Sequence, residues 1–576
     1  MQKPADTRTV RYHCAPISRQ TKQRPSIEVI GIDTEAYDDG RCFMIATSEG
    51  DVWRADDWPH CIGSRKYRGV NFVAYNLKYD EGALIQHLPR KQLEQLRTVG
   101  KTLFENYHYH LIPGKCLTIR HNKHSVMVYD MYNFYRGSLE YNAEKYLGEH
   151  KDDIETKTFT REYVDEHWQR IADYCVKDAD LVKRLAQLLI SRFERFGVNP
   201  RKLYSTAYVS YQYFSRHTNY VTVQRFWDKH RYLLDYAMRS YNGGKFEVTE
   251  KRLDYLYEYD IISAYPNEIK NLIDIRKAQV LRSKTPPKSA VYGFIDVVGK
   301  IPVNVYSPVA LKNGTLNVYP VGEIHKTITK TEYEYLLSQG ADLTINDAVW
   351  LIVDKKEYPY REAIERLVKQ KQEIKKDGDA LEYHTIKIFL NSLYGKFVQL
   401  IEKEDHWQAG TSWNPIYGSI ICANVRTRIS ELQQTYPEVI AVHTDSLIST
   451  KPLPFAKEGE LGDVVYECEG DGLILGSGVY QIGEKVRMRG FDYRKKLTDY
   501  VGKECTSVQI DAVRPLSWRE VVFRNLDLSQ INRFTELPKQ LNIRFDRKRI
   551  WIRDWKRFSD ITDKPVLSMP LYNTLI

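Results

Sequence analysis

Two aspartates at the ends of strand-like runs are the residues of this sequence best suited to carry chemistry. Asp260 lies in YDIISAYPNEI (residues 259–269) and Asp445 in IAVHTDSLIS (residues 440–449). Between them, the segment KIFLNSLYGKF is predicted to form a helix with one side that carries Lys387, Asn391 and Tyr394. Two carboxylates can bridge a pair of Mg²⁺ ions about 3.5–4 Å apart, and such a pair clamps the attacking and leaving oxygens of a nucleotidyl transfer. This order of residues therefore predicts a two-metal site for nucleotidyl transfer.

A second set of carboxylates lies in the first third of the chain. The apolar strand IEVIGIDTEAY ends in Asp33 and Glu35, and residues i and i+2 of a strand share one face. Asp80 follows another apolar run, and Tyr174 and Asp178 are four residues apart on the predicted helix IADYCVKDADLVKRL. Taken singly, such pairs also occur in ordinary turns and on exposed helix faces. Together they predict a second metal-holding site.

Length and composition set limits on the class of protein. With 576 residues the chain is too long for one hydrophobic core, so several domains are expected. Its 85 basic and 75 acidic side chains give a net charge of +10, which suits a polyanionic partner without requiring one. The eight cysteines form no CxxC pair or His/Cys cluster, which favours reduced thiols in a cytosolic protein over a zinc site or disulfide framework. The sequence has no secretory signal, transmembrane run or internal repeat.

The segments around Asp260, Lys387 and Asp445 resemble motifs A, B and C of the family B DNA polymerases, which read DxxSxYP, KxxxNSxYG and DTDS. The earlier carboxylates resemble the DxE, NxxxD and YxxxD motifs of the DnaQ-like 3′–5′ proofreading domain, which precedes the polymerase in that family. Each motif alone is a weak signal. The set implies a multidomain α/β and α+β fold, with an RNase H-like exonuclease domain joined to a right-hand polymerase of palm, fingers and thumb.

The resemblance also implies roles for individual residues of this sequence. Two Mg²⁺ ions per active site, for which Mn²⁺ can substitute, would be held by Asp260 and Asp445 in the polymerase and by Asp33, Glu35, Asp80 and Asp178 in the exonuclease. Tyr174 would orient the attacking water of the exonuclease. The dNTP would contact Ser263, Tyr265, Lys387, Asn391 and Tyr394. Lys387 would be the catalytic cation that neutralises the triphosphate, and Tyr265 would exclude ribose. DNA would contact Asn76, Tyr79, Tyr241, Gly243, Gly244 and Tyr480.

The same resemblance implies the following domain boundaries. The exonuclease domain is predicted at residues 1–200, with a basic N-terminal extension at 1–26. The first part of the palm, with the YNGG segment and motif A, follows at 201–266. The remaining predicted parts are an insertion at 267–358, fingers at 359–397, the second part of the palm at 398–512 and a thumb at 513–576.

Size and layout resemble the protein-primed branch of family B, found in phages, adenoviruses and linear plasmids. In that branch a terminal-protein hydroxyl starts synthesis, and the insertion at 267–358 would be associated with the terminal protein. The resemblance implies replication of a viral or mobile-element genome in the host cytoplasm, by a monomer without membrane contact. The implied partners are primer–template DNA, single-stranded DNA, dNTPs and a terminal protein, although the sequence leaves open whether priming uses a protein.

Four departures from the family pattern stand out. His443 occupies the position of the first Asp of motif C, and Ala36 follows the first exonuclease motif where relatives often have Thr. The Lys-x-Tyr segment reads Gly-Val-Tyr, so the lysine that would contact the priming end is absent at Gly478, and Lys485 and Arg487 are its candidate substitutes. The stretch 398–419 has room only for a stub of the hairpin that strand-displacing relatives carry.

Two alternatives to an active polymerase remain open from the sequence. One is a stand-alone DnaQ-like 3′–5′ nuclease with a non-catalytic, DNA-binding polymerase-like platform. The other is an inactive polymerase relative that serves as a scaffold, for which His443 is the only support. Nucleotide incorporation by the purified chain distinguishes both from an active polymerase.

Overall fold

A computed structural model of the chain describes residues 9–12, 25–58, 64–154, 159–403, 405–491, 495–510, 513–536 and 538–574. Most of the basic extension at 1–26, together with Cys14 and Cys61, lies outside these residues. The six cysteines in the described part are free. Among the described helices none is long and apolar enough to cross a membrane.

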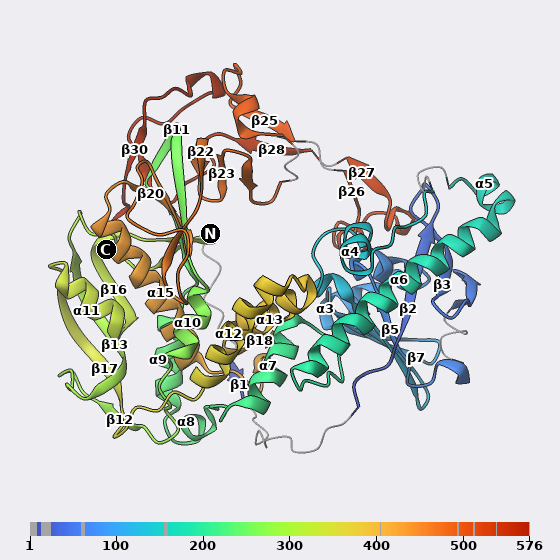
Figure 1. Ribbon diagram of the computed structural model, residues 1–576, viewed down its shortest axis with the longest axis horizontal. Helices are drawn as coiled ribbons and strands as arrows, with labels where there is room; N and C mark the ends of the chain where they lie inside the picture. The colour runs from blue at the N-terminus through green and yellow to red at the C-terminus, as the bar shows by residue number, and fades with distance from the viewer. Residues whose placement is uncertain are drawn as a thin grey trace.

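The first lobe is built on an eight-stranded sheet in the order β4-β3-β2-β5-β9-β8-β7-β6 (Figure 1). Its strands are β2 (Val29–Ala36), β3 (Cys42–Thr47), β4 (Val52–Arg54), β5 (Asn71–Ala74), β6 (Lys101–Phe104), β7 (Tyr107–Ile112), β8 (Cys116–His121) and β9 (His124–Asp130). Its helices are α2 (Leu77–Ile85), α3 (Arg90–Val99), α4 (Leu139–Leu147), α5 (Arg161–Glu166) and α6 (Trp168–Arg195).

The long helix α6 packs closely on β2 because of a glycine. A Cβ added to Gly31 would lie 1.8 Å from the carbonyl oxygen of Ala179, so only glycine allows this approach. The contact aligns the end of β2 that carries Asp33 with the middle of α6, where Asp178 precedes Ala179.

The second lobe has a nine-stranded sheet with its main path in the order β10-β20-β21-β11-β22-β23-β24. Its strands are β10 (Lys245–Val248), β11 (Glu250–Ile261), β20 (Val439–Thr444), β21 (Ser446–Ser449), β22 (Val464–Gly476), β23 (Val479–Ile482), β24 (Lys485–Met488), β29 (Ile550–Trp551) and β30 (Val566–Met569). Helices α10 (Ala264–Lys270) and α15 (Pro415–Thr435) pack together beside it. Since β11 and β21 are neighbours, Asp260 pairs across the sheet with Ser446, next to Asp445.

The region predicted as an insertion forms a five-stranded sheet in the order β12-β17-β13-β16-β31. Its strands are β12 (Gln279–Arg282), β13 (Ala290–Ile301), β16 (Val321–Thr329), β17 (Asp342–Ile352) and the C-terminal β31 (Tyr572–Asn573). Helix α11 (Lys330–Ser338) begins with a capping box between Thr329 and Glu332. A hairpin of β14 (Leu311–Asn313) and β15 (Leu316–Val318) leaves this region.

A helical hairpin stands between the two lobes, and Figure 1 shows it in yellow. Helix α12 (Arg361–Asp377) ends at Gly378, whose φ of 82° reverses the chain into α13 (Ala380–Ser392). The short helix α14 (Tyr394–Phe397) follows. Helices α7 (Thr206–His217), α8 (Gln224–Lys229) and α9 (Arg231–Ser240) connect the first lobe to the second.

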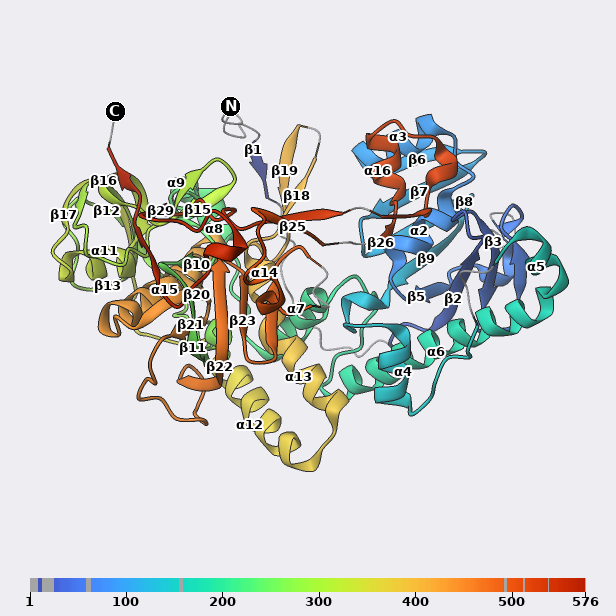
Figure 2. The ribbon, with the colours of Figure 1, turned by 90° about the horizontal axis from the view of Figure 1, so that it is seen from above.

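The C-terminal part of the chain extends from the second lobe to the first (Figures 1 and 2). It contains the paired strands β25 (Ser507–Ile510) and β28 (Lys539–Asn542), the pair β26 (Val513–Pro515) and β27 (Phe534–Glu536), and helix α16 (Trp518–Phe523). Helix α16 packs on α3, and the Trp518 indole donates a hydrogen bond to Glu81 Oε1 at 2.8 Å. The thumb-like segment is therefore anchored on the helix that also carries Asp80.

The stretch 398–419 contains a short hairpin of β18 (Leu400–Glu402) and β19 (His406–Ala409). The N-terminal strand β1 (Thr9–Arg11) pairs in parallel with β19 and completes a three-stranded sheet. The Tyr12 ring lies 5.4 Å from Trp227 and 5.6 Å from Trp413, centroid to centroid. Residues 9–12 of the N-terminal extension are thus bound to the second lobe, an arrangement that the sequence did not predict.

The predicted fold class is confirmed, with an exonuclease-like α/β lobe and a mixed lobe that has palm, fingers and thumb-like parts. The domain boundaries stay predictions. The sheets and the helical hairpin are compatible with them, except that the C-terminal strand β31 belongs to the sheet of the predicted insertion.

Two candidate active sites

One cavity of about 1160 Å³ between the palm sheet and the helical hairpin collects the residues of the three polymerase-like segments. Six of the predicted residues line it: Asp260, Ser263, Tyr265, Lys387, Asn391 and Asp445. These residues are up to 185 positions apart in the sequence (445 − 260), and strand pairing and the helical hairpin bring them together. The cavity is the first candidate active site.

Asp260 and Asp445 lie side by side where neighbouring interior strands of the palm sheet end. The Ile261 amide donates to the Asp445 carbonyl oxygen at 2.9 Å, which fixes the two backbones together. Burial, and then the nearby charge of Asp445, raises the pKa of Asp260 to about 7, and burial raises the pKa of Asp445. Two partly desolvated carboxylates that repel each other favour a bound cation, so this donor set suits a divalent metal.

One residue near each of the two carboxylates has a left-handed backbone conformation. Ser263 has a φ of 48° and Thr444 a φ of 70°, and each lies within three residues of a carboxylate. Non-glycine residues in this region are uncommon and cost free energy, so the surrounding structure must hold them. We read both as local strain at the place where the chain turns to present Asp260 and Asp445.

Tyr265 lines the cavity beside the carboxylates, and Tyr394 packs against Tyr265 without lining the cavity itself. Their ring centroids are 5.0 Å apart, and the Tyr394 hydroxyl contacts the Tyr241 hydroxyl at 2.7 Å and Cys422 Sγ at 2.8 Å. Tyr394 was predicted on the same helix as Lys387, but it belongs to α14, one short turn beyond α13. Tyr241 therefore supports Tyr394 from below rather than lining the cavity itself.

The helical hairpin brings cations to the far side of the cavity. Lys371 and Lys375 of α12 line it together with Lys387 of α13, and Lys457 reaches it from the palm. Lys371 and Lys375 are one helical turn apart on α12, so both can face the cavity. Lys457, Tyr383 and Glu467 also line the cavity and were not predicted, since no motif contains them.

The YNGG loop at residues 241–244 lies directly against this site. A Cβ added to Gly244 would approach the Thr444 methyl to 2.7 Å and the Tyr265 hydroxyl to 2.9 Å, whereas one on Gly243 would meet open space. Gly244 is thus required by packing within the protein, and Gly243 alone offers the open backbone that the predicted DNA contact needs.

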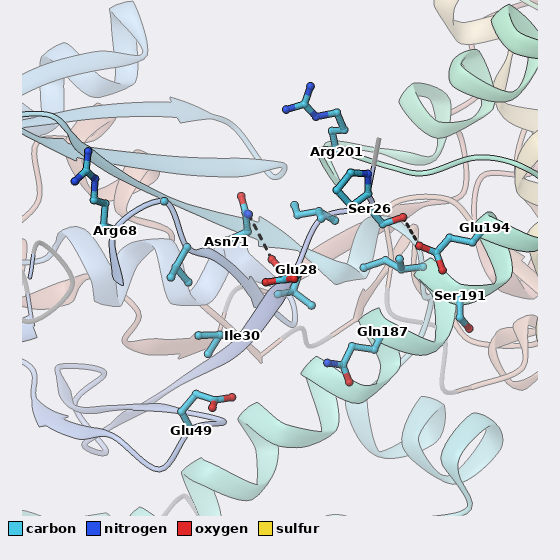
Figure 3. A pocket seen from close by; sticks show the side chains of 16 residues that line it. Ser26, Glu28, Ile30, Glu49, Arg68, Asn71, Gln187, Ser191, Glu194 and Arg201 are labelled. Carbon is cyan, nitrogen blue, oxygen red and sulfur yellow. Dashed lines mark hydrogen bonds between the residues drawn. The ribbon is translucent and has the colours of Figure 1, made fainter. Parts of the chain in front are cut away.

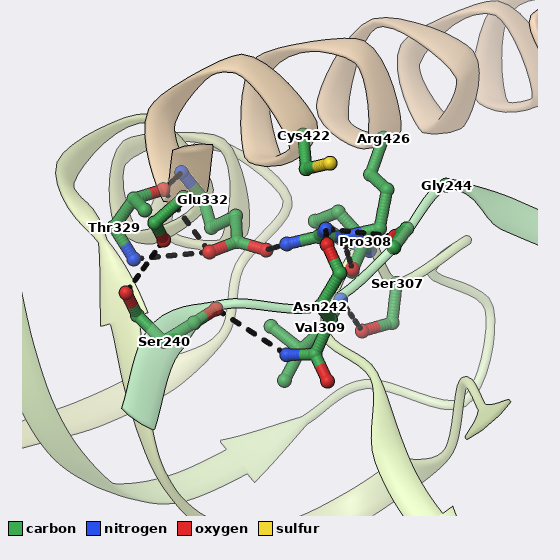
Figure 4. Close-up of polar contacts among 12 residues, drawn as sticks. Ser240, Asn242, Gly244, Ser307, Pro308, Val309, Thr329, Glu332, Cys422 and Arg426 are labelled. Atoms are coloured by element: carbon green, nitrogen blue, oxygen red, sulfur yellow. Dashed lines mark hydrogen bonds and ion pairs between the residues drawn. The ribbon is translucent and has the colours of Figure 1, made fainter. Parts of the chain in front are cut away.

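Buried Arg426 holds the YNGG loop from the side of α15 (Figure 4). Its Nη1 donates to the carbonyl oxygens of Asn242 at 2.5 Å and Gly243 at 2.9 Å, and its Nη2 contacts Glu332 Oε1 at 2.6 Å. The sequence did not predict Arg426, because its partners lie 94 to 184 positions away.

His443 is enclosed in the palm and cannot act as a repelling cation. Its ring stacks on Tyr480 at 4.7 Å, and its Nε2 accepts a hydrogen bond from the Gly478 amide at 3.3 Å. Burial, Lys548 and Lys485 lower the pKa of His443 to about 3, so the imidazole is neutral near pH 7. No positive charge at residue 443 therefore repels a cation from the candidate ligand Asp445.

The carboxylates of the first lobe form the second candidate site. Asp33 and Glu35 on β2 and Cys175 on α6 present ligand atoms that all lie within 4.8 Å of one another. Burial, and then Asp178, raises the pKa of Asp33 to about 7, and burial with Asp33 raises the pKa of Glu35. The Oδ1 of buried Asp178 has no hydrogen-bond partner within the described residues. Such a crowded, desolvated set of acids with a spare ligand atom suits divalent metal ions.

Asp80 joins this site from α2, and Asn76 directly precedes that helix. Asp80 is buried and accepts a hydrogen bond from Thr34 Oγ1 at 2.7 Å, so it faces the same end of β2 as Asp33. Exposed Asn76 precedes α2 in the left-handed conformation, with its amide bound to Asp130 Oδ1 at 3.1 Å. Tyr79 is partly buried, and its ring lies 6.5 Å from that of Phe534 in the thumb-like segment.

Lys151 is a functional candidate that the sequence did not reveal. Its Nζ lies 2.5 Å from Asp178 Oδ2 and 5.1 Å from the centre of the Tyr174 ring. Asp33 and Asp178 both raise the pKa of this lysine, which therefore stays charged. Lys151 belongs to no motif, and only the fold places this cation between the predicted Tyr174 and Asp178.

A separate cavity of about 880 Å³ lies at the start of β2, around Ser26, Glu28 and Ile30 (Figure 3). Arg68, Arg201, Glu49 and Glu194 give it mixed charge, and Ser26 Oγ donates to Glu194 Oε1 at 2.5 Å. The described residues that line it include none of the predicted site residues. It is therefore separate from both candidate active sites.

Comparisons with known proteins agree with this geometry. Residues 152–410 match the family model for DNA polymerase type B, organellar and viral. The fold is similar to phi29 DNA polymerase in an orthorhombic crystal form, with a TM-score of 0.64, and in complex with primer-template DNA and incoming nucleotide substrates, with a TM-score of 0.65. Each is 14% identical and covers 90% of this chain and 100% of that chain. The complex of phi29 DNA polymerase with single-stranded DNA is similar with a TM-score of 0.62. No curated protein sequence matches.

Proposed function

We propose that this chain, whose residues 152–410 match the family model for DNA polymerase type B, is a template-directed DNA polymerase of the viral kind with an associated 3′–5′ exonuclease. The observation that carries the proposal is the single cavity lined by Asp260, Tyr265, Lys387 and Asp445. A carboxylate pair, a ring wall and a cationic helix around one space are the parts that dNTP binding and phosphoryl transfer require.

In this proposal Asp260 and Asp445 would hold two divalent ions, which would supply Lewis acidity for phosphoryl transfer. Lys371, Lys375 and Lys387 bind the triphosphate, whose negative charge they balance from the hairpin side. Tyr394 supports Tyr265 from behind, and Tyr265 lies where the sugar of the nucleotide would rest. Mg²⁺ is the proposed ion, and Mn²⁺ has the same preference for oxygen ligands.

The exonuclease is assigned to Asp33, Glu35, Asp80 and Asp178, with Tyr174 and Lys151 beside them. Lys151 would keep the Asp178 carboxylate oriented, and Tyr174, one turn before Asp178 on α6, would orient a water. Exposed Asn76 and the nearby Tyr79 are the proposed contacts for a single-stranded 3′ end.

Protein priming and a host-cytoplasm location belong to the proposal as well. Support comes from the family description, which includes viral enzymes, and from the insertion sheet that the protein-primed branch has in this position. We propose primer–template DNA, dNTPs, single-stranded DNA and a terminal protein as partners of a monomeric enzyme.

The alternative of a stand-alone nuclease with a non-catalytic platform is disfavoured by the polymerase cavity. A platform that only binds DNA has no need for Asp260 and Asp445 to be partly buried side by side. The hypothesis of an inactive scaffold depends on His443 alone. This residue is buried and neutral, so it gives that hypothesis no support.

Primer extension tests the proposal. The purified chain, a labelled primer annealed to a longer template, Mg²⁺ and four dNTPs should give full-length product, and omission of dNTPs should give shortening of the primer from its 3′ end. A chain that shortens the primer but never extends it would support the stand-alone nuclease instead.

A further inference from the structure

Gly478 occupies the position where the Lys-x-Tyr segment has a lysine, so another residue must supply a positive charge there if one is needed. At this position Gly478 has a φ of 77°, and a Cβ would lie 3.1 Å from Phe246 Cε1 and 3.3 Å from Arg489 Cβ. A lysine is therefore disfavoured here by both backbone conformation and space. A positive charge at this place must therefore come from a residue other than 478.

The two nearby cations expected from the sequence differ in their availability. Lys485 Nζ lies 2.8 Å from Glu258 Oε2 and 3.8 Å from Glu467 Oε1, so it balances acids inside the palm. Lys485 is therefore not a substitute. Arg487 is exposed and lines a cavity of about 370 Å³ that His443 and Gly478 also line.

Arg489 lies directly across the ladder from Gly478. Val479 pairs with Met488 on β24, and the Arg489 amide donates to the Gly478 carbonyl oxygen at 2.9 Å, which continues this pairing by one residue. Opposite residues of antiparallel strands project their side chains to the same face of the sheet. The guanidinium of Arg489 therefore leaves the sheet on the face where a side chain at residue 478 would emerge.

The surroundings of Arg489 are basic and open. It lines the 370 Å³ cavity and also an adjoining cavity of about 720 Å³ that Gly244 and Thr444 border, next to Asp445. Lys312, Arg547 and Lys548 line the larger cavity too. Asp546 is the acid in that lining, and its oxygens accept backbone amides of Ser477 at 2.7 Å and Lys548 at 3.0 Å. Arg489 is exposed, and the described residues include no carboxylate paired with it.

We propose that Arg489 binds a phosphodiester of the primer strand close to its 3′ end, from the position across the β23–β24 ladder that replaces the absent lysine. The inference rests on the proposed polymerase function and adds a DNA-binding residue to it. The ligand class is a nucleic-acid backbone phosphate, which suits a guanidinium that has no carboxylate partner among the described residues and lies at the border of two basic cavities. Packing of the guanidinium over the Phe246 ring at 5.6 Å holds it in this direction without neutralising it.

The test measures binding of the full chain to a fluorescein-labelled primer–template in EDTA, which prevents turnover, over a salt series. Arg489→Ala should weaken binding about tenfold and reduce the slope of log affinity against log salt by about one, because one phosphate contact is lost. Arg489→Lys should keep most of the affinity. Arg428→Ala removes an exposed cation of α15 that lines neither cavity, and should bind like the wild type.

Three outcomes decide the matter. Weaker binding with a shallower salt slope supports the proposal. An affinity and slope for Arg489→Ala within twofold of Arg428→Ala would overturn it. Weaker binding with an unchanged slope and a lower melting temperature would also overturn it, because Arg489 would then only pack on Phe246. Primer extension by the wild type separates these results from a failure of the proposed function, which would show as no dNTP incorporation at all.

Discussion

The ring of Tyr265 lies 5.0 Å from the ring of Tyr394, centroid to centroid, at an angle of 41°. Tyr265 follows a strand of the palm sheet and lines the proposed nucleotide cavity, and Tyr394 follows the helix that carries Lys387. The contact therefore ties one wall of the cavity to the helical hairpin. A side chain held in this way has little freedom to move away from a bound sugar.

Tyr265→Val should therefore admit ribonucleotides. Steric exclusion by a fixed ring rejects a 2′-hydroxyl, and a smaller side chain removes the obstacle. We expect the ratio of dNTP to rNTP incorporation to fall by about tenfold to a hundredfold, on the scale of one steric contact. Tyr383→Val, at another ring that lines the cavity, is the matched control. An unchanged ratio for Tyr265→Val would remove this residue from sugar selection.

The two active sites should be separable. Asp33→Asn with Glu35→Gln should abolish 3′-end degradation and leave extension largely intact, because these residues lie in the first lobe and not in the polymerase cavity. The isosteric changes avoid new voids on buried β2. Gel analysis of one labelled primer reports both activities. Loss of extension in this double variant would show that the assignment of separate sites is wrong.

The metal-free protein should lose stability as pH rises from about 4 to 7. The pKa of Asp33 is raised to about 7 in the fold by burial and Asp178, so the folded state binds more protons than the unfolded chain in this window. Stability is then highest below the unfolded pKa and falls as Asp33 ionises. Melting temperatures in EDTA should show this slope, and Asp33→Asn should reduce it. A slope that is equally steep in Asp33→Asn would assign the effect to other acids.

Many of the candidate site residues could be predicted from the sequence because they lie in short segments. Within such a segment, the spacing between two residues determines whether their side chains point to the same side of a strand or helix. Local periodicity predicts that Asp33 and Glu35 share a strand face and that Lys387 and Asn391 share a helix face, and the resemblance to the family motifs implies their roles. Lys151 and Arg426 could not be predicted, since each acts through partners that only the tertiary fold brings near. Tyr394 was placed one helix too early, because the break between α13 and α14 falls inside the motif.

The short β18–β19 hairpin should limit strand displacement compared with relatives that carry a longer one. Rolling-circle extension with a large excess of primed circle over enzyme measures this property, and we expect products of few circle lengths. The N-terminal strand β1 supports the hairpin through Tyr12, which is buried against Trp227 and Trp413. Tyr12→Ala should therefore shorten the products further. Products many circle lengths long from the wild type, without accessory proteins, would contradict this expectation.

Primer extension by Asp445→Asn tests the central claim most directly. This change keeps the shape of the side chain and removes one charge from the pair that the fold holds at the polymerase cavity. The control Asp471→Asn alters an exposed acid of β22 that does not line the cavity. We expect Asp445→Asn to lower the extension rate by at least about a thousandfold while 3′-end degradation continues, on the scale of losing a metal ligand, and Asp471→Asn to extend like the wild type. Extension by Asp445→Asn at the wild-type rate would contradict the account.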